Sequence, residues 1–243
     1  MSEEQPTAEE TGAVAPGIAF STRLHSWPPD AGFAGLDGKR VADFLAWAYS
    51  NLMVNTNRGV LAEFLVANAL GVLDAPRVEW NAFDLAYKGK RIEVKAGAYL
   101  QAWRQAKLTT PIFGIAPRLP DSTITGMPRV SGRNADCYVF CLFTPTRHED
   151  ATPVQIENWR FYVLAREQLP PEPQKTIGLS ALARRACPVR FEQLRTAVDD
   201  ALGLAAVGAT QLSPCRSDES RDRQGGTGCG ETRSVTTAGP TDT

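Results

Sequence analysis

The alternation of apolar and polar residues predicts two helices in the first third of the chain. Apolar residues recur at helical spacing over residues 41–53 and again over residues 58–70. The polar run 55–57 interrupts this pattern and offers an N-cap for the second helix. Gly71 follows the second helix at the position where a left-handed C-terminal cap is common.

A β-hairpin is predicted in residues 80–95, where apolar and polar residues alternate on both sides of Lys88-Gly89. A two-residue turn at Lys88-Gly89 pairs Tyr87 with Lys90. An earlier strand is expected over residues 77–80.

This register brings three charged residues of the hairpin together. The pairing places Asp84 opposite Glu93, and the alternation of side chains puts Lys95 on the same open face as Glu93. Four apolar side chains fall on the other face and can enter a core: Phe83, Leu85, Ile92 and Val94.

The rest of the chain predicts further helices and strands. Helices are expected over residues 99–107, 176–185 and 188–204, and strands over residues 111–115, 137–143 and 159–164. Residues 117–134 are predicted to form a loop. This order of elements predicts an α/β fold in which helices flank a central mixed sheet.

Composition limits the domain organisation and the location of the protein. Of the 243 residues, 43% are hydrophobic and 22% charged, which is ordinary for one globular domain. We expect that domain over residues 17–207, with disordered segments over residues 1–16 and 208–243. The first residues are polar, and no run is long enough for a membrane span. The five irregularly spaced cysteines favour a reducing cytoplasm.

The net charge of −1 means that no global field attracts nucleic acid, so any basic surface must be local. The segment 88–107 holds six basic residues and one acidic residue, interleaved with aromatic side chains. Such a patch suits a phosphodiester backbone, although basic residues at the hairpin turn equally suit a solvated surface. The predicted nucleic-acid contacts are Arg91, Tyr99, Trp103, Arg104 and Lys107. Three loop arginines extend the patch: Arg118, Arg129 and Arg133.

The three charged residues of the hairpin are of the types that bind a metal ion and a phosphate. Two carboxylates and an ammonium group, those of Asp84, Glu93 and Lys95, can hold a hard divalent cation and a phosphate together. The pattern Glu-x-Lys alone is common by chance, and charges on an open hairpin face also serve to keep a strand soluble.

Two further polar residues flank the hairpin. Glu63 is the only charged side chain of residues 59–73, so it either has a cationic or hydrogen-bonding partner or reaches water. Gln101, on the helix expected after the hairpin, either orients a water or phosphate or is a solvated amide.

The set Glu63, Asp84, Glu93-Val94-Lys95 and Gln101 resembles the PD-(D/E)xK nuclease superfamily, over residues 58–143. That resemblance implies a restriction-endonuclease-like core, similar to that of bacterial nuclease-like proteins. The sequence departs from the motif of this superfamily at Phe83, which stands where many members have proline.

The resemblance implies a role for each of these residues. Asp84, Glu93 and the main-chain carbonyl of Val94 would bind Mg²⁺, for which Mn²⁺ can substitute. Lys95 would hold the attacking water or stabilise charge on the phosphate, Glu63 would act through water or a second metal ion, and Gln101 would position water or the strand. The implied activity is a DNA endonuclease of restriction, defence or repair type that leaves a 5′-phosphate and a 3′-hydroxyl.

Two other classes of function stay open. The same fold can serve as a nucleic-acid-binding module without catalysis, or as a protein-interaction module in which the charged hairpin is a soluble edge. RNA also stays open as a substrate. A homodimer is compatible with cleavage of both strands, and no membrane partner is expected.

Other sequence motifs do not predict a site. Gly38-Lys39 lacks the spacing of a P-loop, and Cys137-x-x-x-Cys141 lacks that of a zinc site.

Overall fold

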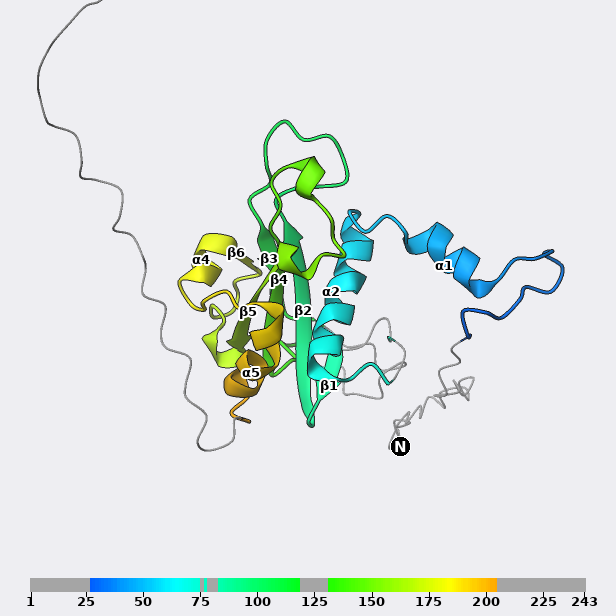
Figure 1. Ribbon diagram of the computed structural model, residues 1–243. Helices are drawn as coiled ribbons and strands as arrows, with labels where there is room; N and C mark the ends of the chain where they lie inside the picture. The colour runs from blue at the N-terminus through cyan, green and yellow to red at the C-terminus, as the bar shows by residue number, and fades with distance from the viewer. Residues whose placement is uncertain (1–26, 75–76, 78–82, 119–130, 205–243) are drawn as a thin grey trace, which may run out of the picture. The chain divides into compact units, whose positions relative to one another are not determined.

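The described part of the chain is built on a four-stranded mixed sheet of order β1-β2-β4-β5 (Figure 1). The computed structural model describes residues 27–74, 77, 83–118 and 131–204. β2 pairs antiparallel with β1 and parallel with β4, and β4 pairs antiparallel with β5. The four strands are β1 Leu85–Tyr87, β2 Lys90–Ala98, β4 Cys137–Phe143 and β5 Trp159–Ala165. The expected α/β class with a mixed sheet is therefore confirmed.

Helices cover one face of this sheet, and a mixed layer covers the other. α2 lies along β2 in Figure 1, and residues of α2 and α5 share one core with alternate residues of the sheet. The second core lies between the opposite face, α4 and a two-stranded sheet of β3 and β6. These elements are α2 Asn55–Leu70, α4 Leu179–Ala183, α5 Phe191–Ala201, β3 Ile112–Gly114 and β6 Thr176–Gly178.

The remaining described elements are one helix and three short 3₁₀ turns: α1 Val41–Tyr49, η1 His148–Asp150, η2 Ile156–Asn158 and η3 Arg166–Gln168. None of the helices within the described ranges has the length and apolar character that a membrane span needs. The expected disordered segments 1–16 and 208–243 lie outside the described residues, as do residues 78–80 of the expected early strand.

β4 is buried along its whole length because it belongs to both cores. Cys137, Val139, Cys141 and Phe143 enter the core beside α2, and the alternate residues Tyr138, Phe140 and Leu142 enter the other. A strand covered on both faces needs a continuous apolar run. This explains why its sequence predicts the strand correctly.

The predicted hairpin register is confirmed. Tyr87 pairs with Lys90, and the turn residues Lys88 and Gly89 have φ angles of 49° and 74°, as a type I′ turn requires. α5 anchors the turn, because Asp199 accepts a hydrogen bond of 2.9 Å from Lys88 Nζ.

The helix expected over residues 99–107 is absent. The side chain of Gln105 instead bonds the main chain of this segment, accepting from Gln101 N at 2.7 Å and donating to Tyr99 O at 3.2 Å. Gln105 also donates to Thr109 Oγ1 at 2.8 Å. These bonds satisfy the backbone locally and hold a loop where helical periodicity is weak.

Several boundaries also differ from the expected ones. α2 begins at Asn55, which therefore lies inside the helix and is not its N-cap. The expected helix 176–185 begins as β6 and becomes α4 only at Leu179. The expected strand 111–115 is confirmed as β3, and Gly71 is the left-handed cap of α2 with φ 73°.

Gly97 marks the point where the ring of Phe113 from β3 packs directly on β2. A Cβ atom at Gly97 would lie 2.7 Å from Phe113 Cε1, and that ring is itself packed edge-on against Phe140. Gly97→Ala should therefore lower the free energy of unfolding by about 1–3 kcal/mol in urea denaturation. The matched control is Gly114→Ala on β3, where no atom lies within 4 Å of the added methyl. Equal stability of the two variants would contradict this packing.

Candidate functional site

Glu93 and Lys95 lie on β2, on the face of the sheet that carries the second core. Their parallel partners on β4 are Tyr138 and Phe140, which belong to that core. Only 4% of Glu93 is exposed. The prediction that the charged face of the hairpin is open is therefore wrong at Glu93, because the segment after β3 covers this residue.

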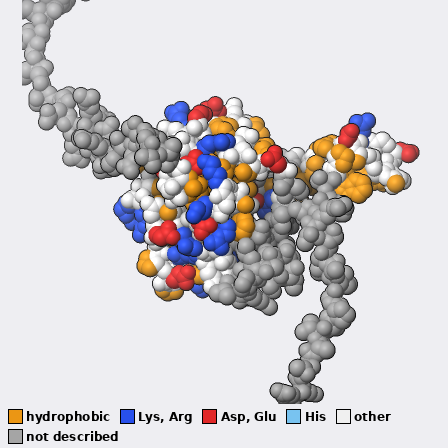
Figure 2. Space-filling model, turned by 90° about the horizontal axis from the view of Figure 1, so that it is seen from below, with side chains coloured by type: hydrophobic (Ala, Val, Ile, Leu, Met, Phe, Trp, Pro, Cys, Tyr) orange, Lys and Arg blue, Asp and Glu red, His pale blue; other side chains and the backbone are white. Residues whose placement is uncertain are grey.

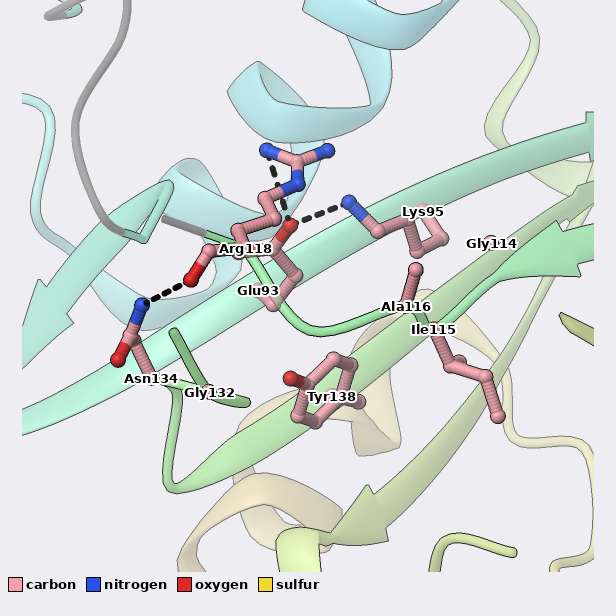
Figure 3. Close-up of a pocket in the computed structure, with 9 residues that line it drawn as sticks. All are labelled: Glu93, Lys95, Gly114, Ile115, Ala116, Arg118, Gly132, Asn134 and Tyr138. Carbon is pink, nitrogen blue, oxygen red and sulfur yellow. Dashed lines mark hydrogen bonds and ion pairs between the residues drawn. The ribbon is translucent and has the colours of Figure 1, made fainter. Parts of the chain in front are cut away.

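The carboxylate of Glu93 is held by two cations on one oxygen. Lys95 Nζ donates a hydrogen bond to Glu93 Oε1, and Arg118 Nη1 lies 3.4 Å from the same oxygen (Figure 3). A buried carboxylate requires such partners, because the loss of water otherwise disfavours its charge. Arg118 enters the site through a long-range contact that spacing along the chain does not reveal.

A cavity of about 160 Å³ opens beside this cluster. Figure 3 shows Arg118 and Lys95 converging on Glu93, with the ring of Tyr138 on the adjacent strand. Residues 114–116, Gly132 and Asn134 also line the cavity. The cavity therefore presents two cationic groups and a phenol at the edge of a buried carboxylate.

Asp84 lies immediately before β1 and is turned toward the main chain of β2. Its Oδ2 accepts a hydrogen bond of 2.6 Å from Val94 N, and its own N–H donates to Ile92 O at 3.0 Å. The N–H and C=O groups of one strand residue point to the same neighbouring strand. The Val94 carbonyl is therefore directed to the edge where Asp84 lies.

Electrostatics links the two carboxylates. Burial raises the pKa of Glu93, and the negative charge of Asp84 raises it further, whereas Lys95 and Arg118 act in the opposite direction. Glu93 is therefore a carboxylate whose charge a bound cation would stabilise.

The donor set fits a hard cation of the magnesium type. Asp84, Glu93 and the Val94 carbonyl would supply the oxygen ligands of such an ion, and Mg²⁺ commonly keeps several waters beside one or two carboxylates. Within the described ranges, no group of three His, Cys, Asp or Glu side chains is arranged for metal binding. Any ion here would therefore depend on main-chain oxygen and water as well as on the two carboxylates.

Glu63 has a cationic partner, which decides between the two alternatives for this residue. Arg77 Nε and Nη2 lie 2.5 and 3.0 Å from its two carboxylate oxygens. Burial raises the pKa of Glu63, the hydrogen bond from Arg77 lowers it, and the charge of Asp84 raises it. Glu63 therefore interacts electrostatically with Asp84 and Lys95, but its carboxylate is bound to Arg77.

Gln101 makes its hydrogen bonds with residues outside this cluster, and its expected role in positioning water or the strand stays a prediction. Gln101 is buried beyond the end of β2, where it donates to Ala98 O at 3.1 Å. Ala98 lies three residues beyond Lys95, about 10 Å along the strand. Arg58 Nη2 donates to Gln101 Oε1 at 3.4 Å, so the amide joins α2 to the end of β2.

Arg58 is a buried residue that the sequence patterns do not single out. Only 3% of it is exposed, and its guanidinium also donates to Met53 O at 2.8 Å and to Asn55 Oδ1. Burial lowers its pKa. Its bonds hold the start of α2 and leave it no exposed surface for a ligand.

The residues expected to contact nucleic acid fall into two groups. Arg91 is engaged within the protein, because its side chain donates to both carboxylate oxygens of Asp136, at 3.1 and 2.9 Å. Tyr99 packs against the second core. Trp103, Arg104 and Lys107 are exposed on the loop that Gln105 holds.

Charges on the described surface are mixed. Figure 2 shows Lys and Arg side chains interleaved with Asp and Glu on one face. This agrees with the near-zero net charge of the chain, so recognition of a polyanion would rest on local groups.

Comparison with models of protein families and with curated proteins finds no match to this chain.

The ion pair of Arg91 and Asp136 predicts a pH dependence of stability. Arg91 holds the pKa of Asp136 below its usual value, so the pair stabilises the fold above the pKa of an unfolded aspartate. Asp136→Asn should lower the free energy of unfolding at pH 7 by about 1–2 kcal/mol. This difference from the unmodified protein should shrink as the pH falls through the lowered pKa.

Urea denaturation between pH 2 and pH 7 measures this effect. Asp150→Asn is the control, because Asp150 is exposed and its ion pair with Arg147 is 3.9 Å long. A deficit of Asp136→Asn that stays constant across this range would contradict the assigned ion pair.

Proposed function

We propose that this chain is a metal-dependent nuclease that hydrolyses phosphodiester bonds at the cluster of Asp84, Glu93 and Lys95. The observation that carries the proposal is the buried Glu93 carboxylate, which shares a polar cavity with Lys95 and is repelled by Asp84. An arrangement needed only for solubility would leave these charges in water.

The position of the cluster in the sheet supports the resemblance to the PD-(D/E)xK superfamily. Glu93 and Lys95 lie on β2, the strand that joins the antiparallel hairpin to the parallel strand β4. α2, which carries Glu63, packs on the same strand. This order matches the one expected for a restriction-endonuclease-like core.

In this proposal, Asp84, Glu93 and the Val94 carbonyl hold Mg²⁺ or Mn²⁺. When bound, the ion would act as a Lewis acid on the scissile phosphate and would lower the pKa of a bound water. Lys95, whose ammonium group already lies on Glu93, orients the attacking water or stabilises negative charge on the phosphate. Glu63, whose side chain Arg77 holds in place, would act through water or help to bind a second metal ion.

DNA is the substrate that we favour, with RNA open. The exposed side chains of Trp103, Arg104 and Lys107 offer an aromatic ring and two cations on one loop, a combination that suits a nucleic-acid strand. Arg91 has no such role here, since its guanidinium is bound to Asp136. The expected products carry a 5′-phosphate and a 3′-hydroxyl.

A nucleic-acid-binding module without catalysis is the second candidate. It is favoured by the two cations on Glu93 Oε1, which would compete with a metal ion for this carboxylate. Such a module would bind DNA with a steep salt dependence and show no metal-dependent turnover.

The full chain should cleave supercoiled, linear or single-stranded DNA, or RNA, with Mg²⁺ or Mn²⁺ and not with EDTA. Asp84→Asn and Lys95→Ala should each lower the single-turnover rate at least about 100-fold, because each removes a group at the scissile phosphate. Their far-UV circular dichroism should match that of the unmodified protein.

Lys90→Ala is the control, because Lys90 is exposed at the hairpin turn. Salt-dependent DNA binding without cleavage would establish the second candidate instead. The absence of cleavage for every substrate form with both ions would refute the nuclease.

A further inference from the structure

Glu93 Oε1 carries two cations of different character. Lys95 is two residues away on the same strand, and only 16% of its side chain is exposed. Arg118 reaches the same oxygen from the segment after β3, at 3.4 Å, with 56% of its side chain exposed. Lys95 therefore belongs to the buried side of the cluster, and Arg118 reaches it from solvent.

The main chain of Arg118 is held by hydrogen bonds, whereas more than half of its side chain is exposed. Arg118 N donates to Gly132 O at 2.9 Å, and Gly132 N donates back to Arg118 O at 3.1 Å. Asn134 Nδ2 adds a bond of 3.4 Å to Arg118 O (Figure 3). The guanidinium can thus leave Glu93 through rotation of its own side chain, without any movement of the backbone.

The formal charges of the cluster balance only while Arg118 is counted. Asp84 and Glu93 carry two negative charges, and Lys95 and Arg118 carry two positive charges. The neighbouring pair of Glu63 and Arg77 is neutral in sum. A divalent cation on the carboxylates would leave two positive charges in excess, which repel the guanidinium from Glu93.

We infer that Arg118 occupies Glu93 in the metal-free protein and that, once a divalent cation holds this carboxylate, Arg118 turns to the substrate phosphate in the adjoining cavity. This inference rests on the proposed nuclease function.

The chemistry of phosphodiester hydrolysis fits a position of Arg118 on the substrate phosphate. A water that has lost one proton to solvent attacks the phosphorus, and the transition state carries two negative charges. As the new P–O bond forms, the bond to the 3′ oxygen breaks, and that oxygen takes up a proton from water to give the 3′-hydroxyl. The two excess positive charges of the loaded site match this state. A guanidinium presents a planar fork to two phosphate oxygens, which an ammonium group does not. Arg118 would therefore be a catalytic residue that touches the substrate.

The experiment is a calorimetric titration of the full-length, substrate-free protein with Mn²⁺, followed by single-turnover cleavage at saturating Mn²⁺. Arg118→Ala removes the competitor, so its dissociation constant for Mn²⁺ should fall about threefold to tenfold. Its cleavage rate at saturating Mn²⁺ should fall about 100-fold, because the transition state loses a charge partner. A merely structural role would not tighten metal binding while slowing cleavage.

Two variants serve as references. Arg118→Lys keeps the charge without the fork, so its Mn²⁺ affinity should stay within about twofold of the unmodified protein while its cleavage slows about tenfold. Arg166→Ala removes another half-exposed arginine, one that lies on Asp136 and Glu167 and not on Glu93. Both of its values should match those of the unmodified protein.

Mn²⁺ affinity of Arg118→Ala that is unchanged or weaker would overturn the inference, as would cleavage at the unmodified rate. In either case, metal binding and cleavage by the unmodified protein would leave the nuclease proposal standing. If the unmodified protein neither binds Mn²⁺ nor cleaves nucleic acid, the proposed function fails and the role of Arg118 fails with it.

Discussion

The arrangement of the site depends on one buried carboxylate. Glu93 lies inside the second core of the protein, on a strand that apolar residues surround, and its charge is tolerated because Lys95 and Arg118 meet it there. Removal of either partner would leave this ionised group with less compensating charge in a poorly solvated place. The nearby charge of Asp84 adds to this demand for positive charge. The polar cavity is therefore a region where electrostatic interactions are stronger than in water.

The pairing of β2 with its two neighbouring strands, rather than the local sequence, brings Asp84 and Glu93 into position. β2 is held on one side by β4, with Glu93 beside Tyr138, and on the other by the hairpin that brings Asp84 to the Val94 main chain. α2 covers the reverse face and carries Glu63 toward the same edge. The close approach of Phe113 to Gly97 brings the segment after β3 over β2, and Arg118 follows in that segment.

Patterns that arise from local chemistry were predictable from the sequence. Lys88-Gly89 determines the hairpin turn and hence the register that places Asp84 near Glu93, and the unbroken apolar run of β4 reports burial on both faces. Contacts between distant segments were not predictable, because no spacing rule joins Arg118 to Glu93 or Arg91 to Asp136. The basic character of Arg91 suggests a phosphate contact, but the carboxylate that binds it lies on another part of the chain. The loop after β2 escaped prediction for a related reason, since the side chain of Gln105 supplies the bonds that a helix would have made.

The most direct measurement is an anomalous-difference map from crystals of the full chain soaked in Mn²⁺. Our account predicts a peak within coordination distance of the Asp84 and Glu93 carboxylates and the Val94 carbonyl, with the Arg118 guanidinium moved away from Glu93. A map in which Mn²⁺ binds elsewhere, while Lys95 and Arg118 both remain on Glu93 at saturating concentration, would contradict it.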